Sequence, residues 1–249
     1  MKKVVHKSSD ETPSIKGGAS FEEFYFEGYY SGIGDFSSSR DKELTNWFKG
    51  MFEYINKLYP IKKGRGRKLI EFGCATGAAA NLLADYGFNV FSTDISKYAV
   101  NLAAKNYEDI KFSVHDMQKF FLKDRNFDVA CAFDVIEHLK DPEMALRNTY
   151  KLLKSGGTII LTTPNDYKHM SNDPTHINVK KPEEWRKILK RVGFGNIVIR
   201  QVSLIPYLYR FHWRLNYALP LAISSPLVIS PVVITARRGG APLGRSPKK

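Results

Sequence analysis

The chain has 249 residues, of which 43% are hydrophobic and 25% charged, a balance that excludes a wholly disordered protein and allows a sizeable buried core. Its two cysteines, Cys74 and Cys131, lie in apolar runs, which excludes a disulfide framework and predicts a reducing, cytoplasmic location. The basic start lacks the apolar stretch of an export signal, and prolines and arginines interrupt the apolar region 202–235, so a soluble protein is expected.

The formal net charge of +13 is concentrated in short segments. Residues 1–16, the linker 61–68 and residues 237–249 hold most of it. Both ends are rich in Gly, Ser or Pro, so disordered basic tails are expected over residues 1–18 and 237–249. A further basic segment, residues 180–191, predicts a helix with a solvated face. The charge therefore does not by itself indicate a nucleic-acid-binding protein.

In chain order, residues 19–60 predict an N-terminal cap made of an aromatic segment and an amphipathic helix from about residue 40 to residue 58. Strands and helices then alternate over residues 61–236, which predicts a parallel sheet covered on both faces. Strands are expected at 68–73, 89–94, 110–116, 127–135, 157–165 and 196–204. A last strand is expected to start directly after Pro231 or to have a bulge there. An apolar insert at about 205–226 interrupts this domain.

A glycine-containing turn follows the first strand of the alternating region. Gly73 and Gly77 permit a tight turn and close approach of a ligand to the backbone, and the next helix offers free N–H groups. A dinucleotide fingerprint requires glycine where this chain has Ala75, which argues against NAD. Asp94 ends the next strand, where an acidic residue accepts hydrogen bonds from a ribose. The turn therefore indicates an adenosyl ligand.

Five blocks follow in order: EFGCATG, STDIS, VHDMQ, FDVACAFDVIEHLKDP and LLKSGGTIILTTPN. Together they resemble the class I S-adenosylmethionine-dependent methyltransferases, particularly the small-molecule branch that includes the ubiquinone-biosynthesis O-methyltransferases. The resemblance covers roughly residues 66–200. It implies an α/β, Rossmann-like, doubly wound sheet of seven strands, mostly parallel with the last strand antiparallel. It also implies S-adenosyl-L-methionine as the cofactor and methyl transfer as the activity.

The resemblance also places individual residues beside the cofactor. They are Glu71, Gly73, Cys74, Ala75, Gly77, Asp94, Ile95, Asp116, Met117, Phe133 and Asp134. Glu71 is expected to approach the methionine amino group, since a carboxylate at an apolar strand end needs a cation or hydrogen-bond donors. Asp94 is expected at the ribose, and Asp116 with Met117 at the adenine. The chain departs from the family at Ala75 and Thr76, where other residues are common.

Two histidines are candidates for the acceptor side of the reaction. His138 follows the fourth strand and His176 lies in the loop after the fifth, so both are expected near the transferred methyl group, where a base assists a hydroxyl acceptor. A structural role is expected for His115. Asp134 and Glu137, together with these two histidines, also have the donor atoms of a metal site, resembling that of small-RNA 2′-O-methyltransferases and of the metal-dependent ubiquinone enzymes, with Asp134 in place of the usual Glu. The sequence leaves the use of a metal open, and no metal ligand is assigned.

The acceptor class also stays open. A small molecule with a hydroxyl or amine, lipid-linked or saccharide types included, is the main hypothesis, and metal-assisted RNA methylation is the alternative, although no RNA-binding module accompanies the core. Residues 204–229 combine apolar, aromatic and arginine residues, as a peripheral membrane contact would, and a cap over the site is the other interpretation. The segment around Tyr25, Tyr29 and Tyr30, with the helix after it, is expected to fold over the cofactor as a lid, with Arg40 near the cofactor carboxylate, and packing on the flank of the sheet is the alternative. The oligomeric state is not indicated.

Overall fold

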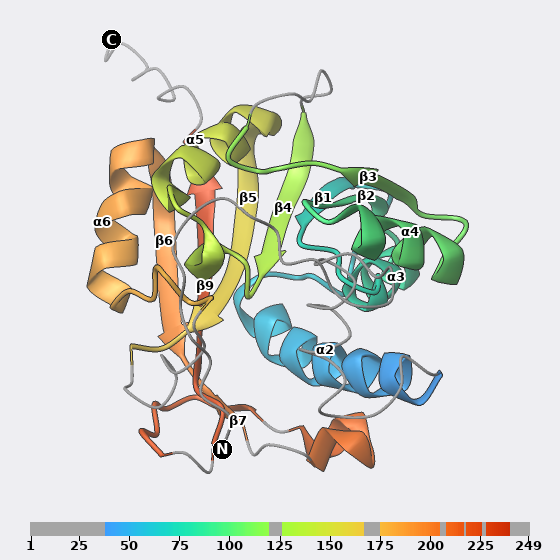
Figure 1. Ribbon diagram of the computed structural model, residues 1–249. Coiled ribbons are helices and arrows are strands. Elements are labelled where there is room, and N and C mark those ends of the chain that lie inside the picture. The colour runs from blue at the N-terminus through green and yellow to red at the C-terminus, as the bar shows by residue number, and fades with distance from the viewer. Residues whose placement is uncertain are drawn as a thin grey trace, which may run out of the picture.

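The computed structural model contains a seven-stranded sheet in the order β3-β2-β1-β4-β5-β9-β6. Residues 38–119, 126–166, 175–204, 208–216, 218–225 and 228–239 are described. All neighbouring strands are parallel except β9, which runs opposite to both β5 and β6 (Figure 1). The predicted doubly wound fold is confirmed, including its antiparallel last strand. Residues 1–18, the tyrosine segment and residues 240–249 lie outside the described residues. Arg237 and Arg238, which were expected to begin the disordered C-terminal tail, are instead the last residues of strand β9 and pair with β5 and β6.

The sheet strands are β1 (Lys68–Phe72), β2 (Asn89–Asp94), β3 (Lys111–Val114), β4 (Phe127–Phe133), β5 (Leu153–Pro164), β6 (Phe194–Gln201) and β9 (Pro231–Arg238). The helices are α2 (Ser38–Leu58), α3 (Ala78–Asp85), α4 (Lys97–Asn106), α5 (Pro142–Leu152) and α6 (Pro182–Val192), with the 3-10 turns η1 (Ile136–His138), η2 (Leu208–Arg210) and η3 (Trp213–Leu215). A small second sheet pairs β7 (Ser203–Leu204) with β8 (Ala218–Leu219).

Alternate side chains of the central strands pack into two separate hydrophobic cores, one on each face of the sheet. In β1, Ile70 joins the cluster that holds Leu146 of α5 and Trp185 of α6. The preceding residue, Leu69, joins the cluster that holds Phe52 of α2 and Leu83 of α3. This alternation of side chains has the period of two that a strand imposes. Both faces are therefore covered, as expected for parallel strands rich in apolar residues.

Several predicted strand boundaries differ from the structure. The strand expected at 157–165 begins at Leu153, and the one expected at 196–204 is divided into β6 and β7. The last strand was expected to start after Pro231, because proline lacks the N–H that a strand interior needs. In the structure β9 begins at Pro231 itself, opposite Pro164 of β5. Both prolines stand at the end of their pairing, where a missing N–H costs no interior ladder hydrogen bond. Proline is excluded from the interior of a strand but is tolerated at its first position, where Pro231 lies.

Residues between β7 and β9 form a lobe at the end of the sheet where β4 and β5 terminate (Figure 1). Leu204 and Ile229 exchange two backbone hydrogen bonds, of 2.7 and 2.9 Å, at the base of this lobe. Helix α2 contacts both η2 and η3. Among the described helices, none combines the length and apolar character needed to cross a membrane.

Candidate functional site

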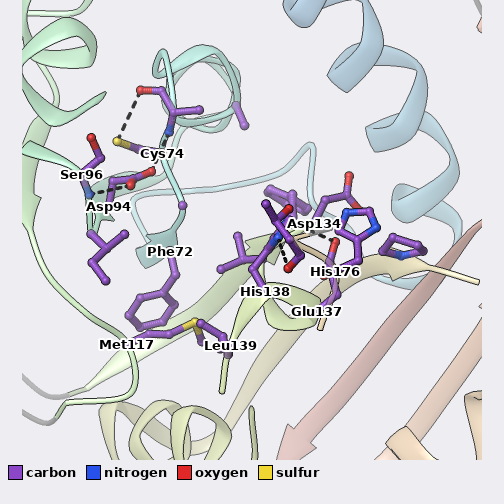
Figure 2. A pocket seen from close by; sticks show the side chains of 18 of the residues that line it. Phe72, Cys74, Asp94, Ser96, Met117, Asp134, Glu137, His138, Leu139 and His176 are labelled. Carbon is purple, nitrogen blue, oxygen red and sulfur yellow. Dashed lines mark hydrogen bonds and ion pairs between the residues drawn. The ribbon is translucent and has the colours of Figure 1, made fainter. Parts of the chain in front are cut away.

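A cavity of about 1020 Å³ lies at the carboxyl ends of the strands. The ends of β1, β2, β4 and β5 contribute to it, together with α2 and the loop that contains His176. Ligands bind at this edge of a doubly wound sheet because the loops after the strands leave a crevice there. Figure 2 shows two groups of side chains facing the cavity, one around Asp94 and the other around His138 and His176. We call them the cofactor half and the acceptor half.

The turn after β1 forms one wall of the cofactor half. Gly73, Ala75 and Gly77 all have positive φ, at 79°, 45° and 89°. The carboxylate of Asp94 accepts hydrogen bonds from the backbone N–H groups of Ala75, at 3.1 Å, and of Ser96, at 2.9 Å. Asp94 thus joins the turn after β1 to the turn after β2. Ala75 stands where a dinucleotide fingerprint has glycine. It adopts a left-handed conformation, which glycine adopts at lower energetic cost.

Glu71 lies beneath this turn, fully buried, and does not line the cavity. The Ser92 hydroxyl donates a 2.5 Å hydrogen bond to its Oε2 atom. Burial raises the pKa of the Glu71 carboxyl group to about 8, the Ser92 hydrogen bond lowers it, and nearby Asp94 raises it further. The expected contact with the methionine amino group therefore stays a prediction, and the structure places a hydroxyl partner beside this carboxyl group.

The rest of the cofactor half combines apolar and acidic groups. Ile95 lines the cavity and is 66% exposed, an unusual exposure for an isoleucine beside a strand end. Met117 is buried, and Asp116 accepts a hydrogen bond of 2.9 Å from the backbone N–H of Gln118. An apolar surface next to a carboxylate suits a planar heterocycle attached to a sugar.

Asp134 stands at the end of β4 between the two halves. Its φ of 53° is left-handed, and a non-glycine residue held there is strained. The Thr162 hydroxyl donates a 2.9 Å hydrogen bond to its Oδ1 atom. Desolvation raises the pKa of the Asp134 carboxyl group, while the Thr162 hydrogen bond and the charge of His176 lower it. The hydrogen bond from Thr162 holds the carboxyl group of this strained residue at the cavity wall.

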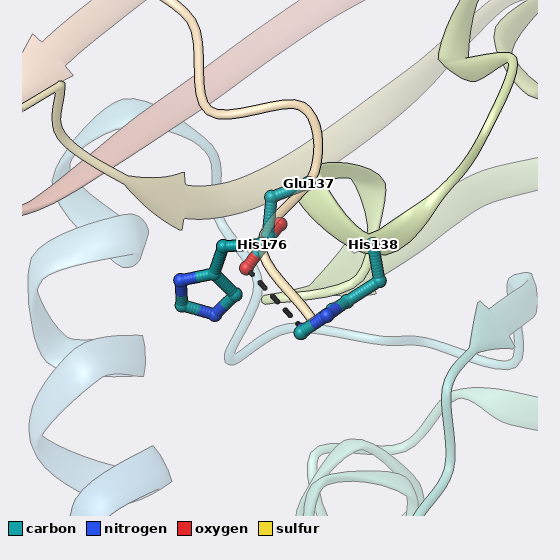
Figure 3. A group of neighbouring side chains, drawn as sticks. All are labelled: Glu137, His138 and His176. Atoms are coloured by element: carbon teal, nitrogen blue, oxygen red, sulfur yellow. Dashed lines mark ion pairs between the residues drawn. The ribbon is translucent and has the colours of Figure 1, made fainter. Parts of the chain in front are cut away.

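The acceptor half is built around His138 and His176, whose ring centroids lie 4.8 Å apart. The Nδ1 atom of His138 is 3.1 Å from the carbonyl oxygen of Thr175. A carbonyl only accepts, so Nδ1 carries the proton and Nε2 is the basic atom of the neutral ring. This Nε2 lies 4.0 Å from a carboxylate oxygen of the buried Glu137 (Figure 3). The hydrogen bond also ties η1 to the loop that carries His176.

Helix α2, the helix expected to fold over the cofactor together with the tyrosine segment, lines the cavity with an apolar wall whose residues were not named from the sequence. Leu44, Trp47 and Phe48 line the cavity, and the Phe48 ring packs 5.7 Å from that of Phe133. These residues follow the i, i+3, i+4 spacing of one helix face. The amphipathic pattern of this helix was therefore the signal that could have found them. The side chain of Arg40, at the start of α2, lies outside the described part of the chain.

Most of the predicted site residues line one cavity. These are Gly73, Cys74, Ala75, Asp94, Ile95, Asp116, Met117, Phe133, Asp134, His138 and His176. Glu71 and Gly77 are outside the lining: Glu71 is buried below the turn, and Gly77 is the left-handed residue that precedes α3. His115, expected to be structural, lines the cavity beside Asp116. Both cysteines are buried free thiols, as predicted.

The fold and cavity match a known family. Residues 44–198, from α2 to β6, match the methyltransferase domain family. The chain belongs to this family. The family assignment made from the sequence blocks is therefore confirmed, and S-adenosylmethionine is the methyl donor of the relatives that support it.

Similar methyltransferases come from several bacteria. The chain is 28% identical over 157 residues to a probable S-adenosylmethionine-dependent methyltransferase of Mycolicibacterium smegmatis, which covers 61% of the chain and 60% of the relative. It is 26% identical over 117 residues to the ubiquinone biosynthesis O-methyltransferase of Coxiella burnetii, which covers 45% of the chain and 49% of that enzyme. The chain thus matches 60% or less of the length of these curated relatives.

Solved structures share the methyltransferase fold. A SAM-dependent methyltransferase from Archaeoglobus fulgidus superposes with a TM-score of 0.62 at 20% identity, covering 86% of this chain and 99% of the other. Phosphoethanolamine N-methyltransferase 2 of Haemonchus contortus, in complex with S-adenosyl-L-methionine, gives a TM-score of 0.62 at 16% identity, covering 91% of this chain and 62% of that one. At these identities the likeness establishes the fold.

Proposed function

We propose that this methyltransferase transfers the methyl group of S-adenosylmethionine to a hydroxyl or amine of a small molecule. The observation that carries the proposal is one cavity that joins the turn around Gly73 and Asp94 to the His138–His176 pair. A cavity of about 1020 Å³ is at the upper end of the range of ligand sites, which suits a cofactor together with an acceptor.

The residues of the cofactor half fit this cofactor. The left-handed turn at Gly73 and Ala75 brings bare backbone to the cavity wall, where the methionyl part would lie. Asp94 provides a carboxylate for the ribose hydroxyls, and the exposed side chain of Ile95 offers an apolar surface for the adenine. Covering an exposed isoleucine also removes apolar area from water, which stabilises the bound state.

The bound cofactor supplies a methyl group already activated by its sulfonium charge. The protein's task is then to align the acceptor, exclude water and remove a proton. The α2 wall of Leu44, Trp47 and Phe48 excludes water from the acceptor half. We assign proton removal to His176, whose ring lines the cavity beside His138, and we assign the positioning of the loop to the hydrogen bond between His138 and Thr175.

A metal-assisted RNA methyltransferase is the second candidate, and one cluster of side chains favours it. The ligand atoms of Glu137, His138 and His176 lie within 4.8 Å of one another. Nitrogen and carboxylate donors in such a group suit a divalent ion. Asp134, the fourth residue of the sequence pattern, is not part of this cluster. The small-molecule proposal ranks first because the apolar α2 wall suits an organic acceptor better than a phosphate backbone.

The substitution His176→Ala tests the proposal once mass spectrometry of incubated metabolite extracts has identified a methylated acceptor. Loss of a general base is expected to lower turnover by about 10² to 10⁴-fold while affinity for the cofactor is retained. Turnover at saturating acceptor and calorimetric binding of the demethylated cofactor product measure the two effects separately. His115→Ala is the contrast, since His115 lies on the cofactor side beside Asp116 and its loss should act on cofactor affinity.

A wild-type rate in the His176→Ala variant contradicts the role of His176 as the base. The second candidate is tested by metal dependence and by methyl transfer to RNA. If a chelator abolishes activity, a divalent ion restores it and RNA is methylated, the small-molecule proposal is wrong. Activity that is unchanged by a chelator supports the first candidate.

A further inference from the structure

The lobe between β7 and β9, which we call the insert (residues 204–229), is joined directly to the cavity. Its two ends meet at the Leu204–Ile229 bridge. Ile229 and Pro231, at this base, line the cavity. The insert therefore begins at the cavity wall and extends away from it, beside α2 (Figure 1).

Specific hydrogen bonds and an ion pair hold the insert against the body of the protein. The Asn216 side-chain amide donates a 2.9 Å hydrogen bond to the carbonyl of Trp47 in α2. Arg210 forms an ion pair of 3.5 Å with Glu43 of the same helix. At the base, the Ser203 hydroxyl donates a 2.9 Å hydrogen bond to the Leu221 carbonyl. These contacts fix which side chains of the insert face solvent.

The side chains that face solvent are to a large extent apolar. Phe211 is 78% exposed, Leu215 47%, Leu221 48% and Leu208 37%. Four of the eight exposed large hydrophobic residues among the described ones thus fall in 14 consecutive positions. Single exposed apolar residues are common on protein surfaces, but neighbouring ones mark a contact surface. Leu208, Phe211 and Leu215 lie in or between the turns η2 and η3, which contact each other.

The charged residues of the insert itself are all positive. The sequence has no Asp or Glu after Glu184, whereas Arg210 and Arg214 lie within the insert. The guanidinium of exposed Arg214 lies 5.4 Å from the centre of the Trp213 ring, so an amphipathic ring sits beside a cation. Apolar side chains flanked by Arg and an aromatic ring are complementary to the headgroup region of an anionic bilayer.

We propose that the insert docks on the surface of an anionic lipid bilayer, with Phe211 and Leu215 entering the boundary between headgroups and acyl chains. Ile229 and Pro231, at the base of the docked insert, line the cavity. The proposal goes beyond the proposed function and does not depend on the acceptor being a lipid.

Vesicle co-sedimentation of the full chain tests the proposal. Neutral phosphatidylcholine vesicles are compared with vesicles that contain phosphatidylglycerol. The wild type is expected to bind the anionic vesicles, and Phe211→Glu to weaken this binding by about 10-fold or more, since it removes a large apolar side chain and adds a repelled charge. Met144→Glu, which puts the same charge at a 45% exposed apolar position on α5, is the matched control and should bind as the wild type does.

Several results overturn the proposal. These are no binding to anionic vesicles, equal binding to both vesicle types, or an equal loss in Phe211→Glu and Met144→Glu, which assigns binding to charge elsewhere in the chain. A wild-type dimer in solution that Phe211→Glu dissociates makes the insert a contact between copies instead. Calorimetric binding of the demethylated cofactor product shows whether each variant is folded. The same measurement on the wild type tests the proposed function independently of vesicle binding.

Discussion

The carboxyl group of Glu71 makes the stability of the fold depend on pH. It ionises near pH 4.5 in the unfolded chain, whereas burial raises its pKa to about 8 in the folded protein. Between these values the folded state holds a proton that the unfolded state has lost. The stability contributed by this proton is present below pH 4.5 and is lost as pH rises through 8.

We therefore predict that Glu71→Gln, which keeps the shape but cannot ionise, gains stability relative to the wild type as pH rises. The gain has a ceiling of about 1.4 kcal/mol per pH unit within the window. Urea unfolding of both proteins without cofactor, at pH 5 and pH 8, measures it. A difference between the two proteins that is the same at both pH values would show that Glu71 is ionised in the folded state.

Ala75 carries a backbone cost that glycine avoids. With φ at 45°, its Cβ atom faces the penalty of about 1 to 2 kcal/mol that applies to left-handed residues. Ala75→Gly removes this penalty. It also raises the conformational entropy of the unfolded chain, which lowers the free energy of unfolding by about 0.4 to 1 kcal/mol. We predict a small net gain in the free energy of unfolding, measured in urea.

The neighbouring glycine gives the opposite test. A Cβ atom at Gly77 would lie 2.7 Å from the Tyr107 ring, at a φ of 89°. Gly77→Ala is therefore expected to destabilise the protein. If both substitutions destabilise it, the left-handed strain at Ala75 is smaller than the entropy that a glycine adds to the unfolded chain.

Helix α5 is the element that supports the loop after β3. Its N-cap residue, Asp141, accepts a 2.9 Å hydrogen bond from the backbone N–H of Met144, and Pro142 follows it at the first helical position. The Asn148 side chain donates hydrogen bonds to the carbonyls of Met117, at 3.3 Å, and Gln118, at 2.9 Å. The position of Met117 in the cavity therefore depends on this helix.

We predict that Asp141→Ala lowers the free energy of unfolding by about 1 kcal/mol, the usual value of an N-cap side chain. Chemical denaturation measures this loss. Asp141→Asn is the control, since its amide oxygen still accepts the hydrogen bond and should retain most of the stability. Equal losses in both variants would mean that charge, rather than the capping hydrogen bond, stabilises this end of α5.

Elements were more predictable than side-chain partners. The alternation of apolar strands and helices predicted the parallel part of the sheet, because strand burial leaves a local pattern in the sequence. The antiparallel last strand was predicted from the family resemblance. The family blocks predicted Asp94 and Asp134 beside the cofactor, and the position of His176 in the loop after the fifth strand predicted that it lies at the same edge of the sheet; all three line one cavity. The partner of Glu71 was not predictable, since Ser92 is 21 positions away and meets it only through the pairing of β1 with β2. The role of Phe48 likewise depends on where α2 packs.

At the scale of the whole molecule, some of the positively charged side chains form ion pairs and hydrogen bonds within the fold. In the basic linker, Lys62 forms an ion pair of 2.5 Å with Glu53. Arg67 donates hydrogen bonds to the carbonyls of Gly64 and Lys63, and its guanidinium lies 5.1 Å from the centre of the Phe88 ring. The linker thus offers less free charge to a polyanion than its composition indicates.

We therefore predict that any RNA binding by this methyltransferase is non-specific and electrostatic. Such binding releases counterions, so raising salt from 50 to 200 mM should weaken it by at least about 10-fold, without preference for sequence. Fluorescence anisotropy with two unrelated RNA oligomers measures affinity, and transfer of labelled methyl groups measures reaction. No methyl incorporation into either RNA is expected, because the cavity wall formed by Trp47 and Phe48 is apolar. Binding that resists salt and discriminates between the oligomers, with incorporation into one of them, would instead identify RNA as the acceptor.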